Sequence, residues 1–334
     1  MAKKTPIKKS TAKSQVPAKK QSKKADTAVP AAETKKAENK TGNKKIITFI
    51  IVAVVVLLAA EMAFVISKQA QANKKPVLVS AWDVQYGTQV GMPVSGSSLY
   101  VIDSRLNQIK SYEKMDGKLK ETYQFDSVPK WAGEMSDGRV FVLLNDAPVI
   151  YEMKKNKAVE FITEGMKQPI NFVIDSENSI IVSDQGTGKI IKYDSTGNKV
   201  FEIGGRGMGK GKFLGNGRVT VDNKDNIYVL EGGAPFMVKI FDKAGKFLKE
   251  WKMPVKQMHG MENLAVTHDG NVYINDWNDS TIKVFSNNGK LLGKFINDAA
   301  MTYKIGAPGA FSGGPDNYIY VGSHNMAVFE PVKY

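Results

Sequence analysis

Residues 218–251 read RVTVDNKDNIYVLEGGAPFMVKIFDKAGKFLKEW, and this stretch decides the fold. Its apolar and aromatic residues form four short runs, namely Arg218–Asp222, Asn226–Leu230, Met237–Phe241 and Lys246–Trp251. Turn-forming residues separate the runs, and Gly245 can supply the positive φ that a tight hairpin turn needs. Four short strands joined by tight turns form one blade of a β-propeller. The stretch therefore predicts a four-stranded antiparallel sheet.

The same pattern recurs between residues 97 and 329. In successive copies, the run that corresponds to Asn226–Leu230 is found near Tyr100, Phe141, Ile181, Tyr228, Tyr273 and Tyr320. These positions are 41, 40, 47, 45 and 47 residues apart, and a period of this length indicates repeated supersecondary units. Six such units predict an all-β, six-bladed β-propeller over residues 76–334.

Three of the copies resemble the repeats of a known family. Residues 170–204, 217–251 and 262–295 are similar to NHL repeats, and the connector GGRGMGKGKFLGNGR at residues 204–218 resembles the glycine-rich segment that this family places before the innermost strand of a blade. The resemblance covers about residues 90–330, and the other copies match more loosely. NHL propellers mostly act as interaction platforms, so the resemblance implies a binding function.

The sixth copy has only three strands before Tyr334. The extended apolar run at residues 76–86 lies outside the copies and is expected to supply the missing outer strand. An unpaired sheet edge would otherwise expose backbone groups to aggregation.

An apolar segment precedes the repeats. Ile46–Ile66 is a run of 21 residues whose only charged residue is Glu61, long enough to cross a hydrocarbon layer of about 30 Å. We therefore expect a transmembrane helix over residues 46–67 and a linker over residues 68–75. The alternative is a signal peptide cleaved after Ala72, but the apolar run is longer than such peptides usually have.

Most of the positive charge lies before this segment. Residues 1–45 contain 14 Lys and three acids, a net charge of +11, which leaves +3 for the rest of the chain. With few large apolar residues, this tail is expected to be disordered and cytoplasmic, with the propeller extracytoplasmic at the cell membrane. Anionic lipid is a possible partner of the tail, whereas the nearly neutral propeller argues against nucleic acid.

Polar residues follow the second strand of each copy, at one recurring point of the blade. Asp and Asn side chains bond to nearby backbone in turns, so a structural role comes first. These turns are nevertheless expected on the rim around the central channel, where propellers usually bind ligands. The candidate ligand or partner residues on this rim are Arg105, Asp146, Gln185, Glu231, His259, Trp277 and His324.

A metal-dependent hydrolase or lyase is the alternative function. Some enzymes with an NHL-like propeller bind zinc through histidines at the channel, and here only His259 and His324 are expected on the rim, with Glu262 as a third ligand. His268 falls in a turn on the opposite face. Catalytic zinc ordinarily takes three protein ligands. Propeller lactonases instead hold a divalent cation with Glu, Asn and Asp side chains, and the residues here that imitate them are Glu231, Asn145 and Asp276.

The sequence thus favours a membrane-anchored propeller that binds a protein, a peptide or a cell-envelope glycan. It indicates no catalytic residue and no cofactor, while the enzyme alternative would require a divalent cation. A third hypothesis is a sensor that passes ligand binding to a cytoplasmic partner, since Glu61 within the span is suited to contact another helix.

Overall fold

A computed structural model of the chain describes residues 39–72, 77–83, 93–155, 157–254, 263–276, 281–295, 310–314, 316–322 and 325–333. Helix α1 (Asn39–Ala72) contains the apolar segment Ile46–Ile66, whose side chains are all exposed. The helix is longer at both ends than the expected span at residues 46–67, and it includes the last residues of the expected tail and the first of the expected linker. Residues 1–38 of that tail lie outside the described residues.

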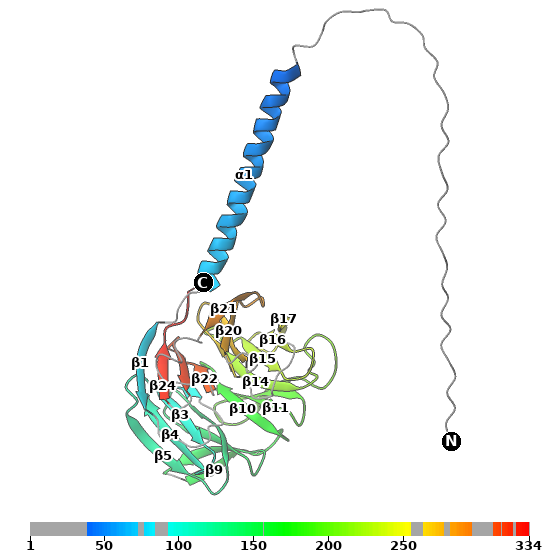
Figure 1. Cartoon of the computed structure of the whole chain (residues 1–334). Coiled ribbons are helices and arrows are strands. Elements are labelled where there is room, and N and C mark those ends of the chain that lie inside the picture. Colours follow the sequence, from blue (N-terminus) through cyan, green and yellow to red (C-terminus); the bar gives the residue numbers. More distant parts are fainter. Residues whose placement is uncertain are drawn as a thin grey trace, which may run out of the picture. The chain divides into compact units, whose positions relative to one another are not determined.

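The part of the chain described after α1 forms six four-stranded antiparallel sheets, so the predicted six-bladed β-propeller is confirmed (Figure 1). The first blade contains β2 (Val94–Ser95), β3 (Ser98–Asp103), β4 (Gln108–Glu113) and β5 (Leu119–Gln124). The second contains β6 (Pro129–Glu134), β7 (Val140–Leu144), β8 (Ile150–Lys154) and β9 (Lys157–Ile162). The third contains β10 (Pro169–Ile174), β11 (Ile180–Asp184), β12 (Lys189–Tyr193) and β13 (Lys199–Gly204).

The remaining blades follow in chain order. The fourth contains β14 (Asn216–Val221), β15 (Ile227–Glu231), β16 (Met237–Phe241) and β17 (Phe247–Lys252). The fifth contains β18 (Leu264–Val266), β19 (Val272–Asp276), β20 (Thr281–Phe285) and β21 (Leu291–Phe295). The sixth contains β22 (Ala310–Gly313), β23 (Ile319–Gly322), β24 (Asn325–Phe329) and, at its outer edge, β1 (Leu78–Asp83).

The sixth blade is built from both ends of the propeller sequence. β1 pairs antiparallel with β24, with Trp82 opposite Met326, and Figure 1 shows β1 beside the red C-terminal strand. The backbone groups along the outer edge of β24 are thereby paired with a neighbouring strand, which closes the ring.

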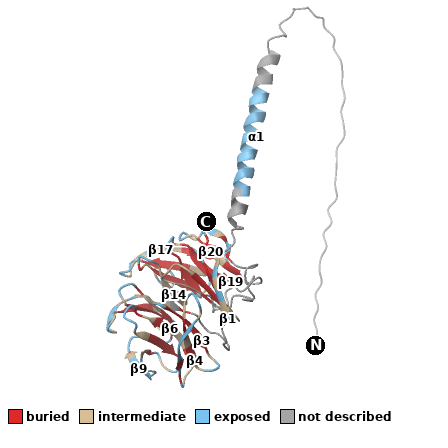
Figure 2. Ribbon diagram, turned by 90° about the vertical axis from the view of Figure 1, so that its left-hand side faces the viewer, coloured by how far each residue is buried: buried red, intermediate tan, exposed pale blue. Residues whose placement is uncertain are grey.

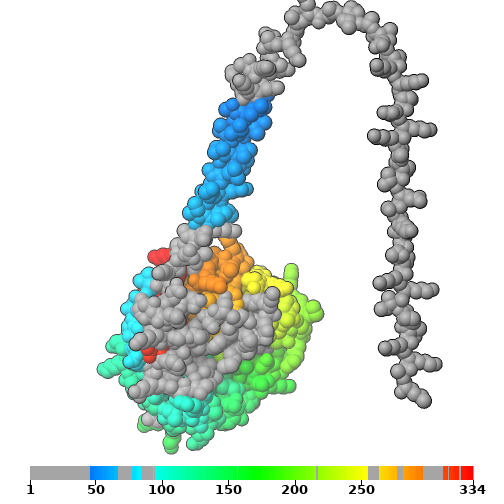
Figure 3. Space-filling view, viewed as in Figure 1, coloured from blue at the N-terminus to red at the C-terminus, as the bar shows by residue number. Residues whose placement is uncertain are grey.

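The strands of each blade are named A to D from the inside outward, and the first strands, β2, β6, β10, β14, β18 and β22, are the A strands. Consecutive A strands from β2 to β22 contact one another around the centre of the propeller. In Figure 3 the colours of the propeller pass from cyan through green and yellow to orange, as expected when consecutive blades lie side by side.

The hydrophobic core lies between the blades. The buried apolar residues form six clusters in the described part of the chain, one at each junction of neighbouring blades, and Figure 2 shows the blade interiors as buried. Tyr228 and Tyr273 lie in two of these clusters, as their alternation in the strands predicts. Burying one large apolar side chain stabilises the fold by about 1.5–3 kcal/mol.

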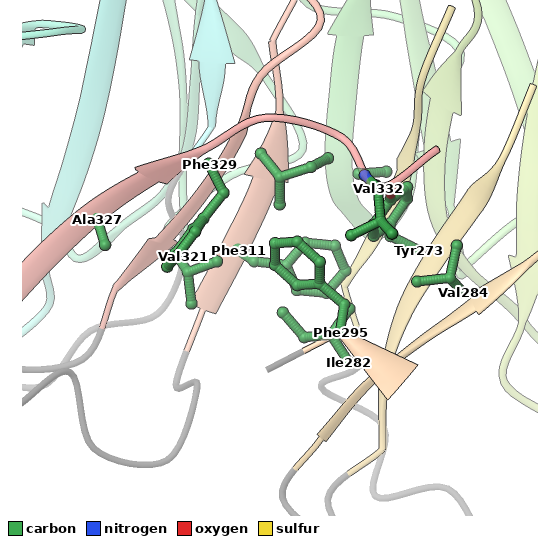
Figure 4. Close-up of a cluster of buried hydrophobic side chains, with 11 residues drawn as sticks. Tyr273, Ile282, Val284, Phe295, Phe311, Val321, Ala327, Phe329 and Val332 are labelled. Carbon is green, nitrogen blue, oxygen red and sulfur yellow. Dashed lines mark hydrogen bonds between the residues drawn. The ribbon is translucent and has the colours of Figure 1, made fainter. Parts of the chain in front are cut away.

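The junction of the fifth and sixth blades shows this packing in detail (Figure 4). Phe295 packs edge-on against both Tyr273 and Phe329, with ring centroids 5.5 and 5.4 Å apart. The Tyr273 hydroxyl accepts a hydrogen bond of 3.1 Å from the backbone N–H of Val332. This contact fixes the end of the described chain against the fifth blade.

Candidate functional site

The A strands surround a cavity of about 390 Å³ at the centre of the propeller. All six blades contribute to its lining, through residues that include Ser95, Trp131, Phe172, Arg218, Leu264 and Phe311. We call it the channel cavity. Its volume lies in the range of pockets that hold small ligands, about 300–1,000 Å³.

The channel cavity lies toward one end of the blades. The turns between strands A and B contribute Ser136, Ser176, Asn223 and His268 to its lining. Because neighbouring strands are antiparallel, the turns between strands B and C lie at the opposite end of each blade. The cavity is therefore directed toward the A–B turns, and the B–C rim expected from the sequence contributes none of its described candidates to the lining.

Two side chains meet inside this cavity. The guanidinium carbon of Arg218, on the A strand of the fourth blade, lies 4.6 Å from the ring centroid of Trp131, on the A strand of the second blade. At this separation the cation interacts with the face of the indole ring. The five N–H donors of a guanidinium lie in its plane, so an arginine held over an aromatic ring can still use its edge to bind a planar anion.

Arg218 has no anionic partner within the part of the chain that the structure describes. No carboxylate lies within 4.0 Å of its guanidinium, and no hydrogen bond from the guanidinium to the protein is present there. Burial lowers the pKa of Arg218 to about 10, which leaves it charged at neutral pH. A cation held in a partly buried cavity without an anionic partner is costly, and such groups are concentrated at functional sites.

Irregularities in the A strands occur next to these side chains. The register of β6 against β7 shifts between Pro129 and Trp131, and that of β14 against β15 shifts between Asn216 and Val219. A bulge of this kind redirects the side chains around it, which here include Arg218. The alternation of a regular strand does not reveal such a change of direction.

A buried amide fixes the strand that carries Arg218. The side-chain amide of Asn171, on β10, donates a hydrogen bond of 3.0 Å to the carbonyl of Val219 and accepts one of 3.1 Å from its N–H. On the other side of Arg218, the Ser183 hydroxyl donates a hydrogen bond of 2.6 Å to the carbonyl of Gly217. These bonds hold β14 against the third blade and so position Arg218.

Carboxylates gather near the A–B turns that line the cavity. Asp175 is paired with Lys192 at 2.7 Å. Glu134, Asp222 and Asp225 accept hydrogen bonds only from neutral donors, for example the Tyr100 hydroxyl at 2.9 Å from Glu134, and within the described part of the chain none of them forms an ion pair within 4.0 Å. Burial raises the pKa of Tyr100, and the negative charge of Glu134 raises it further. The channel cavity thus combines a cation in the strands with acidic groups near the turns.

The rim candidates predicted from the sequence have different surroundings. Arg105, Asp146 and Gln185 are exposed in B–C turns. Glu231 is buried, with 1% of its surface exposed. The other candidates lie outside the described residues, namely His259, Trp277 and His324.

The contacts of Glu231 indicate a structural role. Its carboxylate lies 3.3 Å from the ammonium of Lys239 and accepts a hydrogen bond from the N–H of Leu214, in the glycine-rich connector. In the preceding blade, Asp184 accepts hydrogen bonds from the connector N–H groups of Lys167 and Gln168. The acids at the end of strand B in these two blades therefore hold the incoming connector, in agreement with the structural interpretation of their periodicity.

The residues proposed for a divalent cation are not brought together in the described part of the chain. Glu231 pairs with Lys239, Asp276 pairs with Lys283 in the next blade, and Asn145 is exposed. No group of three or more His, Asp or Glu side chains suited to hold a metal is present among the described residues. His259, Glu262 and His324 lie outside them, so the metal hypothesis stays a prediction.

Sequence reasoning missed Trp131, Asn171 and Arg218. The signal that could have identified Arg218 is its residue type. An arginine in the A strand lies next to the central channel.

No protein-family model matches the sequence. The protein brain tumor of Drosophila melanogaster is 25% identical over 129 residues, which are 38% of this chain and 12% of that protein. The match therefore spans only a small part of the relative.

Solved structures of several kinds share the fold. Virginiamycin B lyase from Staphylococcus aureus is 15% identical, with a TM-score of 0.52 over 72% of this chain and 80% of that one. A gluconolactonase from Xanthomonas campestris is 10% identical, with a TM-score of 0.54 over 77% and 97% of the chains. Hydrazine synthase from Kuenenia stuttgartiensis is 11% identical, with a TM-score of 0.53 over 75% and 97%. These likenesses support the propeller fold, and the different activities that they carry show that the fold alone does not determine a function.

Proposed function

We propose that this chain is a membrane-anchored propeller of the NHL-repeat type that binds a protein, peptide or cell-envelope glycan outside the cytoplasm, with the channel cavity as its ligand site. The observation that carries the proposal is the charged guanidinium of Arg218, held over Trp131 in a cavity of about 390 Å³ without an anionic partner in the described part of the chain. The N–H groups of this guanidinium can therefore donate charge-assisted hydrogen bonds to a ligand.

The anchor is supported by the exposure of α1. Large apolar side chains of Ile46–Ile66 are 48–76% exposed, with Phe49 the most exposed of them. An apolar surface of this length is unfavourable in water and favourable in a hydrocarbon layer. The lysine-rich residues 1–45 favour a cytoplasmic N-terminus by the usual excess of positive charge on that side.

Membrane fractionation tests the anchor. The full chain should stay in the membrane at alkaline carbonate pH, and protease added outside intact cells should digest the propeller. A variant that lacks residues 46–66 should become soluble. Release of the full chain by carbonate, or protection of the propeller from external protease, would contradict the proposal.

Arrays of peptides and cell-envelope glycans test the binding function. The full chain in lipid nanodiscs should retain a defined set of ligands, and Arg218→Gln should lose them. Hydrolysis or cleavage of a bound ligand by the wild-type protein, suppressed by a chelator, would instead favour the metal-dependent enzyme. Absence of any retained ligand would remove the binding proposal.

A further inference from the structure

The positive and negative side chains that line the channel cavity lie at different positions along the strand direction. Arg218 lies within β14, and Asp222 follows the end of that strand, four residues later. At the usual rise of a strand, four residues correspond to about 13 Å. Glu134 ends β6, and Asp225 lies in the A–B turn of the fourth blade. The cation is therefore inside the channel and the unpaired acids are near the A–B turns.

We propose that the channel cavity binds a short peptide with a free carboxyl terminus, whose carboxylate lies on the edge of Arg218 and whose amino group faces Glu134 and Asp222. This inference rests on the proposed binding function and specifies the ligand of the same site. A carboxylate accepts two parallel N–H donors from a guanidinium, and Trp131 covers the face of the guanidinium without using these donors.

The charges select a zwitterion over a simple anion. Three carboxylates near the entrance, which form no ion pair within 4.0 Å among the described residues, repel an anionic ligand and attract an ammonium group. An extended tripeptide spans about 10 Å between its ends, which suits the separation between Arg218 and the acids. An acidic sugar has the carboxylate but lacks the amino group, so it fits only half of the site.

The same arrangement has a consequence for the free protein. A partly buried cation without an anionic partner destabilises the fold, and its replacement by the shorter, neutral side chain of glutamine removes that cost. A purely structural arginine behaves in the opposite way, because its loss removes contacts. The stability of Arg218→Gln without ligand therefore distinguishes a binding role from a structural one.

The experiment uses the full chain in detergent micelles and four probes, namely tri-alanine, tri-alanine amide, N-acetyl-tri-alanine and glucuronate. Calorimetry and thermal melts measure their binding. Tri-alanine should bind about tenfold or more tightly than the amide, since a charge-assisted pair is lost with the carboxylate. The acetylated peptide should also bind more weakly. Glucuronate should bind more weakly than tri-alanine.

Arg218→Gln should abolish the preference for tri-alanine over its amide and should melt at or above the wild-type temperature without ligand. Arg218→Lys keeps the charge but not the forked donors, so it should retain part of the preference and provides a second variant if the glutamine variant fails to fold. Arg206→Gln, in the exposed connector, changes the net charge equally and should leave binding unchanged.

The inference would be overturned by equal binding of the peptide and its amide by the wild type, by a preference that survives in Arg218→Gln, by a lower melting temperature of ligand-free Arg218→Gln than of the wild type, or by glucuronate binding as tightly as tri-alanine. Absence of tri-alanine binding would also overturn it. In that case ligands retained on the arrays would leave the broader binding function standing, so the two failures are distinguishable.

Discussion

The indole ring of Trp82, on the outermost strand of the sixth blade, occupies the space beside Gly117 in the first blade. A Cβ atom on Gly117 would lie 2.1 Å from Cδ1 of Trp82, closer than any real contact. Gly117 has a φ of 70°, in the left-handed region that glycine adopts readily. Ser80 on the same strand donates a hydrogen bond to the carbonyl of Met115. β1 thus completes the sixth blade and also contacts the first.

Replacement of Trp82 tests the closure of the ring. Trp82→Ala should lower the free energy of unfolding by about 3 kcal/mol, as expected when a large side chain is removed from a packed junction. Chemical unfolding measures this change. Val79→Ala, at an exposed position of the same strand, should change stability by less than about 1 kcal/mol.

Gly117→Ala should also destabilise the protein, because its Cβ would displace the indole ring. Equal stability of Trp82→Ala and the wild type would show that the contact between β1 and the first blade does not contribute to closure. The deletion of residues 76–86 should have a larger effect than either substitution, because it removes the whole outer strand.

Much of the fold was predictable because it depends on local patterns. The strands of each blade are short runs of apolar and aromatic residues between turns, and their repetition defines six blades without knowledge of long-range contacts. Tyr273 could be assigned to a junction between blades from alternation alone. Trp82 could not be paired with Gly117, because that contact joins segments that no repeat relates.

The candidate site was less predictable for a physical reason. Turn residues such as Glu231 attract attention because they are charged, yet this carboxylate holds Lys239 and the connector N–H of Leu214. Arg218 is directed by a local irregularity of β14 and by the hydrogen bonds of Asn171 to its neighbour. Those relationships involve two blades and do not appear in a single strand pattern.

Glu231 should therefore prove important for stability. Glu231→Ala should lower the free energy of unfolding by about 3 kcal/mol, because it removes one of the two carboxylates that pair with the buried Lys239, leaving Glu250 at 3.3 Å, and leaves the Leu214 N–H without its acceptor. Chemical unfolding tests this expectation. Glu202→Ala removes an exposed carboxylate from a neighbouring blade and should cost less than about 1 kcal/mol. A Glu231→Ala protein of wild-type stability that no longer binds ligand would instead make Glu231 a rim ligand.

Tyr193 should contribute to the loss of stability at alkaline pH. Burial raises its pKa to about 12, and the nearby Asp184 and Glu202 add to this shift. The unfolded tyrosine loses its proton near pH 10, whereas the folded one keeps it, so its contribution is complete below pH 10 and decreases as the pH rises toward 12.

Unfolding experiments between pH 9 and 12 measure this effect. Tyr193→Phe should be less stable at pH 8, because it loses the hydrogen bond of 2.8 Å to the Glu164 carbonyl, but its stability should fall less steeply above pH 10. Parallel curves for the two proteins would show that Tyr193 does not contribute to the pH dependence.

A recurring contact links the A–B turns of neighbouring blades. Asn178, Asp225 and Asn317 each have a positive φ, between 60° and 68°. Their side-chain oxygens accept hydrogen bonds from the preceding blade, at 2.8 Å from the N–H of Ser136, 3.0 Å from that of Ser176 and 2.7 Å from that of His268. Asn and Asp adopt this backbone conformation more readily than other residues with a Cβ.

The junction between the fourth and fifth blades has Gly270 at the corresponding position, with a φ of 77°. A Cβ there would lie 3.7 Å from the nearest atoms, on Asn287, which is an ordinary contact. Gly270→Asn should add a hydrogen bond to the N–H of Asn223 and restrict the unfolded chain, and so raise the free energy of unfolding by about 1 kcal/mol. Thermal and chemical unfolding measure the gain.

Two variants serve as controls. Gly270→Ala lacks the amide and should be destabilised by the strained backbone. Asn178→Gly should lower the free energy of unfolding by about as much as Gly270→Asn raises it. If the asparagine variant is no more stable than the alanine variant, then the turn contacts are a consequence of blade packing and do not stabilise it.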